Sequence, residues 1–161
     1  MEIRAMQPSD HAAALALNNG NVPALNELDA PELARLAGMA VAALAAEVDG
    51  AFAGFCIVLP PGADYDSLNY GWFSRRYNDF VYLDRIVVDP TFRRDGIGRA
   101  FYTDLVARFT GVAPVLLCEV NVRPRNEPSL LFHHSIGFRE VGQQETDGGN
   151  KTVSLLALPL G

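Results

Sequence analysis

Cysteine and long apolar runs are scarce in this sequence. Its two cysteines, Cys56 and Cys118, lie among apolar residues, and neither belongs to a C-x-x-C pair or a Cys/His metal spacing. Both are predicted to be free core thiols in a reducing compartment. No apolar run approaches about 18 residues, and the N-terminus lacks the apolar segment of a signal peptide. These absences predict a cytoplasmic protein with no membrane association and no metal site.

Positive charge is also in the minority. The chain has 19 acidic residues against 13 Lys and Arg, and its formal net charge is −6. Because phosphate backbones are bound by positively charged surfaces, we expect no nucleic-acid partner. An acidic surface weakly favours a cationic substrate such as an amine. The 161 residues suit a single domain over 1–161, which would bury about 70% of the surface of the unfolded chain.

A strand, a glycine-containing turn and a helix are predicted in succession between residues 80 and 109. The strand, Tyr82–Val88, is rich in β-branched and aromatic residues and ends at Asp89-Pro90. The helix is predicted from apolar residues at steps of four: Ile97, Phe101, Leu105 and Phe109. Between them, arginines flank Gly96 and Gly98, so that backbone N–H groups and the helix N-terminus can face one anion. The expected ligand is a phosphate.

The turn is distinguished from two common phosphate-binding loops by what it lacks. No lysine follows the glycines, as a P-loop requires, and Phe101 stands where a dinucleotide fingerprint has its third glycine. The segment resembles the acetyl-CoA signature of the GNAT superfamily of N-acetyltransferases, V-x-P-x-x-[RQ]-x-x-G-x-[GA]. The matching residues are Val88, Pro90, Arg93, Gly96 and Gly98. The alternative is a tight turn that only packs the helix on the strand.

A second segment of the chain resembles the same family. Its pattern N-x-x-[AS]-x-x-[LF]-Y-x-x-x-G-F is matched at Asn126, Ser129, Phe132, Gly137 and Phe138. The sequence departs from the pattern at His133, where the family often has Tyr. Asn126 is predicted to cap a short helix that stops at Gly137.

The remaining elements fit the family's order, so the resemblance covers nearly the whole chain. Asp49-Gly50 predicts a hairpin turn, and Asp29 with Glu32 has the spacing of a capping box. The predicted strands are 2–6, 42–48, 51–59 and 115–120 with a closing hairpin of 139–142 and 152–158, and the predicted helices begin after Pro8–Asp10 and after Asp29. The resemblance implies an α/β (α+β) fold: a mixed, mostly antiparallel sheet of six to seven strands, splayed between strands 4 and 5 and flanked by helices.

The resemblance also implies where acetyl-CoA binds. The pantetheine arm would pair with the backbone of Ile86, Val87 and Val88, and a bulge near Val87 would free an N–H group to polarise the thioester carbonyl. The pyrophosphate would be held by Arg93, Arg94, Asp95, Gly96, Ile97, Gly98 and Arg99. Asn126 would hydrogen-bond the pantetheine arm, and Phe132 would line the same site.

The implied reaction is direct acetyl transfer to a primary amine of a small molecule or peptide, which needs a base for the amine proton. Glu119 is the first candidate, because an acid inside an apolar strand is costly without a task or a partner. The alternative is an ion pair with Arg85 or Arg123. Asp84 is the second candidate, or half of an ion pair with Arg85. His133 either protonates the departing thiolate or merely lines the cofactor site.

Residues 60–79 are predicted to form a long loop with five aromatic residues: Tyr65, Tyr70, Trp72, Phe73 and Tyr77. Tyr70, Trp72 and Phe73 are expected to wall the acceptor pocket, and a dimer interface is the alternative. Asn18 begins a polar link to Asp29, which lies beside the acceptor in the family or is an ordinary helix connection. A monomer and a homodimer both remain open. The rival to an enzyme is a non-catalytic acyl-CoA-binding module of the same fold.

Overall fold

A computed structural model describes residues 1–22 and 25–161. Pro23 and Ala24, which belong to the predicted link between Asn18 and Asp29, lie outside the described residues. Among those described, seven strands form one hydrogen-bonded sheet in the order β1-β2-β3-β4-β5-β7-β6. β4 and β5 run parallel, and the other recorded strand pairs are antiparallel. This architecture confirms the predicted mixed, mostly antiparallel sheet.

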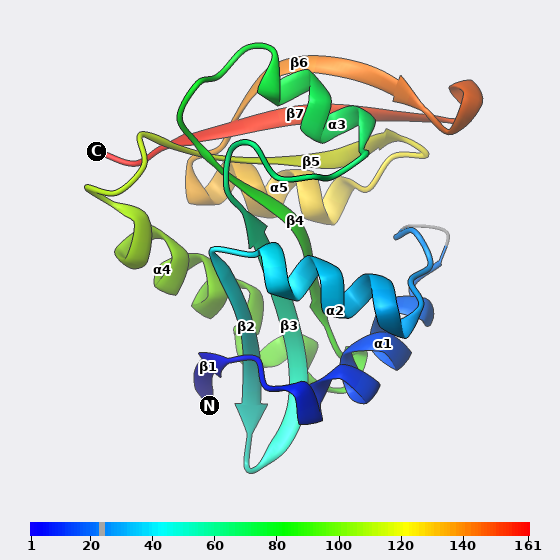
Figure 1. The fold of residues 1–161 in the computed structure, drawn as a ribbon, viewed down its shortest axis with the longest axis vertical. Coiled ribbons are helices and arrows are strands. Elements are labelled where there is room, and N and C mark those ends of the chain that lie inside the picture. The colour runs from blue at the N-terminus through cyan, green and yellow to red at the C-terminus, as the bar shows by residue number, and fades with distance from the viewer. Residues whose placement is uncertain (23–24) are drawn as a thin grey trace. The chain divides into compact units, whose positions relative to one another are not determined.

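The elements follow the predicted order closely (Figure 1). The strands are β1 (Glu2–Ala5), β2 (Ala42–Val48), β3 (Ala51–Leu59), β4 (Val81–Val88), β5 (Val115–Arg123), β6 (Arg139–Thr146) and β7 (Lys151–Pro159). The α-helices are α1 (His11–Asn19), α2 (Ala30–Met39), α3 (Leu68–Ser74), α4 (Ile97–Phe109) and α5 (Glu127–Ile136). The closing hairpin of β6 and β7 is longer than predicted. The residues of β6 are mostly polar and exposed, so the sequence lacks the apolar pattern that would have indicated the full strand.

The chain divides into two compact units by its internal contacts. The first unit comprises Met1–Pro60 with Leu83–Arg108, and the second comprises Pro61–Tyr82 with Phe109–Gly161. The prediction of one domain over residues 1–161 stays a prediction. No helix in the described part of the chain is long and apolar enough to cross a membrane.

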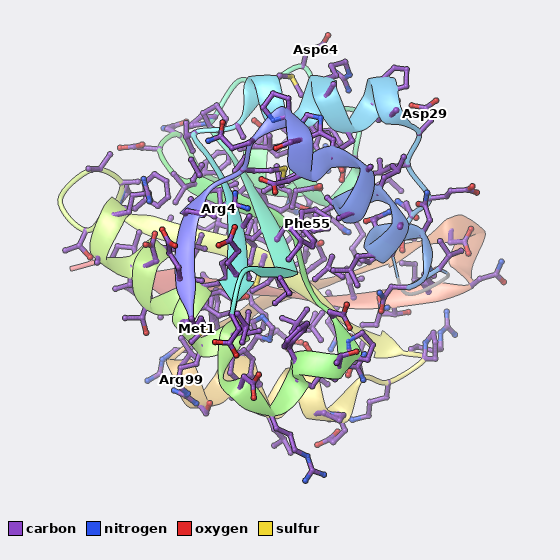
Figure 2. The ribbon with its side chains drawn as sticks, turned by 90° about the horizontal axis from the view of Figure 1, so that it is seen from below. Met1, Arg4, Asp29, Phe55, Asp64 and Arg99 are labelled. Atoms are coloured by element: carbon purple, nitrogen blue, oxygen red, sulfur yellow. The ribbon has the colours of Figure 1, made fainter. Side chains whose placement is uncertain are left out.

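The first unit is built on local signals that the sequence displays. Asp49 and Gly50 have φ of 51° and 79°, as a two-residue hairpin turn between β2 and β3 requires. The Asp29 carboxylate caps α2 by accepting a hydrogen bond from the Glu32 N–H at 2.9 Å. Leu33 turns inward from that helix and is inaccessible to solvent. Both α1 and α2 contact β3, and Figure 1 shows α2 crossing in front of that strand. Figure 2 shows the two helices along one side of β2 and β3.

The second unit contains the main correction to the sequence analysis. Residues 60–79, predicted as a loop, include the seven-residue helix α3. The Ser67 hydroxyl caps this helix by accepting a hydrogen bond from the Tyr70 N–H at 3.3 Å. A helix of two turns with Gly71 inside it has too short an apolar stripe to show helical periodicity.

Candidate active site

The predicted phosphate turn connects β4 to α4 in the first unit. A 3₁₀ turn, Pro90–Asp95, leads to Gly96, whose φ of 75° and ψ of 23° are left-handed. The first hydrogen bond of α4 runs from the Ala100 N–H to the Gly96 carbonyl at 3.0 Å. The N–H groups of Ile97 and Gly98 therefore precede the first hydrogen bond of the helix, which makes this end of α4 suited to an anion.

Charge around the turn fits a diphosphate. Arg93, Arg94 and Arg99 are all exposed, and the exposed Asp95 is the one acid among them. No atom lies within 4 Å of the position that a Cβ on Gly96 would take. Open space, three guanidinium groups and a helix N-terminus are what a bound diphosphate requires. These residues fit the pyrophosphate of acetyl-CoA, whose binding here stays a prediction.

Gly54 on β3 lies against β4 and was missed by the sequence analysis. A Cβ at this position would stand 2.5 Å from the Val87 carbonyl oxygen and 3.3 Å from the Val88 Cα. The Asp89 N–H donates to the Ala53 carbonyl at 2.8 Å next to this contact. A glycine inside an apolar strand is the signal that could have revealed it. The bulge expected near Val87 stays a prediction.

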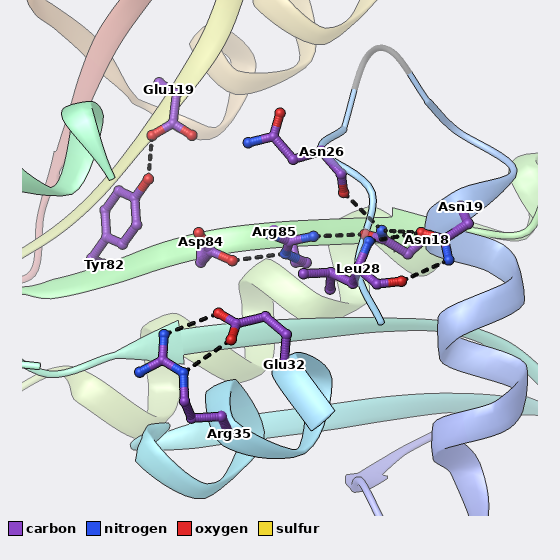
Figure 3. A network of polar contacts seen from close by, with 10 residues as sticks. All are labelled: Asn18, Asn19, Asn26, Leu28, Glu32, Arg35, Tyr82, Asp84, Arg85 and Glu119. Carbon is purple, nitrogen blue, oxygen red and sulfur yellow. Dashed lines mark hydrogen bonds and ion pairs between the residues drawn. The ribbon is translucent and has the colours of Figure 1, made fainter. Parts of the chain in front are cut away.

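Asp84 and Asn18 belong to one buried polar network in the first unit (Figure 3). The Asp84 carboxylate lies 2.7 Å from Nε of Arg85, and the Arg85 Nη1 donates to the Asn18 Oδ1 at 2.8 Å. The Asn18 Nδ2 donates in turn to the Asn26 carbonyl at 3.0 Å. The ion pair of Asp84 and Arg85 is thus confirmed, and it makes Asp84 the poorer candidate for a base. Asn18 is inaccessible to solvent in this network, so its contact with an acceptor stays a prediction.

Glu119 on β5 has a hydrogen-bond donor that the sequence analysis did not name. The Tyr82 hydroxyl of β4 donates to the Glu119 Oε1 at 2.5 Å (Figure 3). Tyr82 is in register with Leu117, two residues before Glu119, so both side chains lie on one face of the sheet. The suggested partner Arg123 lies against the Gly149 carbonyl at 2.5 Å and 3.9 Å from Glu145. The register of β4 and β5 comprises Val81 with Leu116 and Tyr82 with Leu117. The predicted splay between these strands stays a prediction.

His133 is buried on α5 in the second unit. Its Nδ1 lies 2.7 Å from the Ser129 carbonyl oxygen, which can only accept, so Nδ1 carries the proton. Burial lowers the pKa of His133, and its backbone contact with Ser129 opposes this only in part. A neutral ring with its proton on Nδ1 has none on Nε2 to donate. These surroundings disfavour the predicted acid role, which stays a prediction.

Asn126 is confirmed as the cap of α5. Its Oδ1 accepts a hydrogen bond from the Ser129 N–H at 3.3 Å, and the helix ends at Gly137 with φ of 118°. Phe132 lies edge-on to the His133 ring with the ring centroids 5.6 Å apart. The predicted contacts of Asn126 and Phe132 with the pantetheine arm stay predictions.

The aromatic residues of segment 65–77 pack within the second unit. Tyr70 and Phe73 are buried, so they are core residues and need neither a pocket nor an interface to explain them. The Trp72 ring fills the space beside Gly142 on β6, where a Cβ would stand 2.5 Å from the ring. The Arg76 guanidinium carbon lies 3.7 Å from the centroid of that ring. The predicted acceptor contacts of Tyr70, Trp72 and Phe73 stay predictions. Burial of the Tyr70 and Phe73 rings disfavours such contacts for these two residues.

Comparison with known families gives the class of the protein. Residues 13–138 match the model of the acetyltransferase (GNAT) family. This match covers most of the chain, and the chain therefore belongs to the GNAT acetyltransferase family.

Individual relatives are similar over different lengths. The [ribosomal protein bS18]-alanine N-acetyltransferase of Escherichia coli K12 is 32% identical over 88 residues, which cover 51% of this chain and 57% of the enzyme. The crystal structure of the ribosomal-protein-S18-alanine N-acetyltransferase from Escherichia coli has a TM-score of 0.76 at 21% identity, covering 99% of this chain and 94% of that one. The Salmonella typhimurium protein yncA, solved with its cofactor acetyl-CoA, has a TM-score of 0.74 at 20% identity, covering 100% and 94%. These structures share the fold.

Proposed function

We propose that this protein transfers the acetyl group of acetyl-CoA directly to a primary amine, with Glu119 as the general base. The observation that carries the proposal is a half-buried carboxylate on β5 of a GNAT-family chain, held by the hydroxyl of Tyr82. A carboxylate of this kind can accept the proton that an ammonium group must lose before its nitrogen can attack. Asp84, already paired with Arg85, is less suited to this task.

The other roles follow from the chemistry of the chain. The exposed guanidinium groups of Arg93 and Arg94 and the first-turn N–H groups of α4 would bind the diphosphate. The backbone of Ile86–Val88 would orient the pantetheine arm. Acetyl-CoA would supply the activated acetyl thioester when bound. Glu119 then takes a proton from the amine, whose nitrogen forms the new amide bond as the carbon–sulfur bond breaks and the thiolate leaves.

The first acceptor class to test is a peptide N-terminus. The curated relative is named for acetylating the alanine of a ribosomal protein, and its matched segment includes about half of each chain. A small-molecule amine is the second class. Both belong in one panel, assayed by release of CoA from acetyl-CoA.

Glu119→Gln tests the proposed base, because it keeps the shape of the side chain and removes the proton acceptor. Turnover should fall by about 10²-fold or more while the affinity for acetyl-CoA is kept. The matched control is Glu145→Gln, which removes an exposed carboxylate of β6 and should leave turnover unchanged. Parental turnover of Glu119→Gln from about pH 6 to 9 would exclude this role for Glu119. Acetyl-CoA binding without release of CoA by any acceptor would favour the non-catalytic module.

A further inference from the structure

We propose that Tyr82 is a positioning residue that fixes the Glu119 carboxylate, and that Tyr70 and Phe73 of α3 hold Tyr82 in place for this purpose. The inference rests on the proposed role of Glu119 as the base. It assigns a task to the buried Tyr70 and Phe73 of the aromatic segment 65–77. All of the residues concerned belong to the second unit.

The hydrogen bond between Tyr82 and Glu119 joins neighbouring parallel strands. Tyr82 pairs in register with Leu117, so the phenol reaches diagonally to the residue two positions further along β5. The distance between the hydroxyl oxygen and Oε1 is 2.5 Å, as for a hydroxyl that donates to a carboxylate. A hydrogen bond to a carboxylate is charge-assisted and is stronger than one between neutral groups. Tyr82 therefore restricts the direction in which the carboxylate points.

The Tyr82 ring is itself held on two sides. Its centroid lies 5.3 Å from that of Tyr70 and 5.8 Å from that of Phe73, with interplanar angles of 66° and 53°. The contact with Tyr70 is edge-on, a geometry that aromatic pairs prefer, and the contact with Phe73 is tilted. Tyr82 is only 1% exposed. A tyrosine ring with so little space cannot swing its hydroxyl away from Glu119. Tyr70 and Phe73 of α3 thus restrict the Tyr82 ring, and the Tyr82 hydroxyl restricts the Glu119 carboxylate.

A free glutamate side chain has several rotatable bonds, and fixing it costs conformational entropy. A base that is already aligned avoids this loss during the reaction. Tyr82 acts through Glu119, so the removal of its hydroxyl should matter only while Glu119 can accept a proton. This dependence separates a positioning role from a contribution to stability, which would be the same in both backgrounds.

The test is a double-mutant cycle of Tyr82→Phe and Glu119→Gln in the full chain. Tyr82→Phe keeps the ring between Tyr70 and Phe73 and should lower kcat about tenfold with an unchanged KM for acetyl-CoA. In the Glu119→Gln background, Tyr82→Phe should cause no further fall. Tyr102→Phe, which removes the hydroxyl of another buried tyrosine on α4, should leave kcat unchanged.

Phe73→Leu provides a second variant that keeps the Tyr82 hydroxyl but loosens its support. It should lower kcat in the parent and have no effect on kcat in the Glu119→Gln background. The inference is overturned if Tyr82→Phe has the parental kcat. It is also overturned if its loss is undiminished beside Glu119→Gln, or if Tyr102→Phe causes the same loss.

One readout does not depend on activity. A proton in a short O–H···O bond resonates far downfield in an NMR spectrum, and this signal should be present in the parent, absent in Tyr82→Phe and displaced in Glu119→Gln. If the signal is missing in the parent, the positioning role fails whatever the reaction is. If the signal is present but no amine releases CoA from acetyl-CoA, the proposed function fails, and the positioning of a base fails with it while the contact itself stands.

Discussion

Gly54→Ala tests whether the close approach of β3 to β4 determines the position of the β4 backbone that is expected to bind the pantetheine arm. The added Cβ would stand 2.5 Å from the Val87 carbonyl oxygen, whereas ordinary contacts begin at 3.4 Å. The backbones must therefore separate by about 0.9 Å at this point, because neither strand has a flexible side-chain end there that could yield. The added Cβ would also stand 3.3 Å from the Val88 Cα, which is closer than an ordinary contact.

The expected cost follows from this displacement. Overpacking of a closed site costs about 1 to 3 kcal/mol, reduced by less than about 1 kcal/mol because alanine lowers the entropy of the unfolded chain. In a chain of this length, 1 kcal/mol corresponds to about 2 to 4 °C in Tm. Gly54→Ala should therefore lower the Tm by several degrees. It should also weaken acetyl-CoA binding, because the backbone of Val87 moves.

Thermal unfolding and titration calorimetry with acetyl-CoA measure the two effects separately. The matched control is Gly38→Ala on α2, where a Cβ meets no atom within 4 Å and alanine is the better helix former. That variant should have the parental affinity and an equal or higher Tm. If Gly54→Ala unfolds at the parental temperature and binds acetyl-CoA with parental affinity, the close approach of the strands does not set the position of Val87.

Three further outcomes are expected. Gly96→Glu should abolish acetyl-CoA binding, measured by calorimetry, because it places a side chain and a negative charge in the phosphate turn. The control Gly50→Glu, at a similar φ of 79° in the β2–β3 turn, should carry the same backbone strain and keep binding. Trp72→Ala should weaken acceptor use without changing acetyl-CoA affinity; a dimer that becomes monomeric at unchanged acceptor kinetics would instead indicate an interface, as light scattering would show. Because burial lowers the pKa of His133, the unfolded chain binds its proton more readily, so the free energy of unfolding should fall as pH drops below about 6.5. Urea unfolding should lose this part of the pH dependence in His133→Phe and keep it in the exposed control His134→Phe.

The sequence predicted those features that a residue and its immediate neighbours decide. The left-handed glycine at Gly96, the hairpin turn at Asp49-Gly50 and the helix end at Gly137 all depend on a local need for positive φ. The cap at Asn126 depends on one side chain and an N–H three residues away. These local signals occurred in an order that matches one family, and so the whole fold could be predicted from them.

Features that depend on strand register were beyond the sequence. Tyr82 and Glu119 are 37 positions apart, and only the pairing of Tyr82 with Leu117 brings them together. The sequence shows Gly54 only as one residue of an apolar strand, and its contact with Val87 exists because β4 lies beside β3. The sequence also predicts an exposed aromatic loop, because it does not show that Tyr70 and Phe73 are buried.

The donor that Tyr82 offers to Glu119 differs in charge from the donor that Arg85 offers to Asp84. An arginine partner engages a carboxylate in a charge-assisted hydrogen bond, so that the carboxylate is less available to an amine. Asp84 has such a partner in Arg85, whose Nε lies 2.7 Å from its carboxylate. The Tyr82 phenol is neutral, so it can orient the Glu119 carboxylate without adding a positive charge. The two acids thus differ in their hydrogen-bond donors, and the difference favours the proposed proton transfer at Glu119 and a structural ion pair at Asp84.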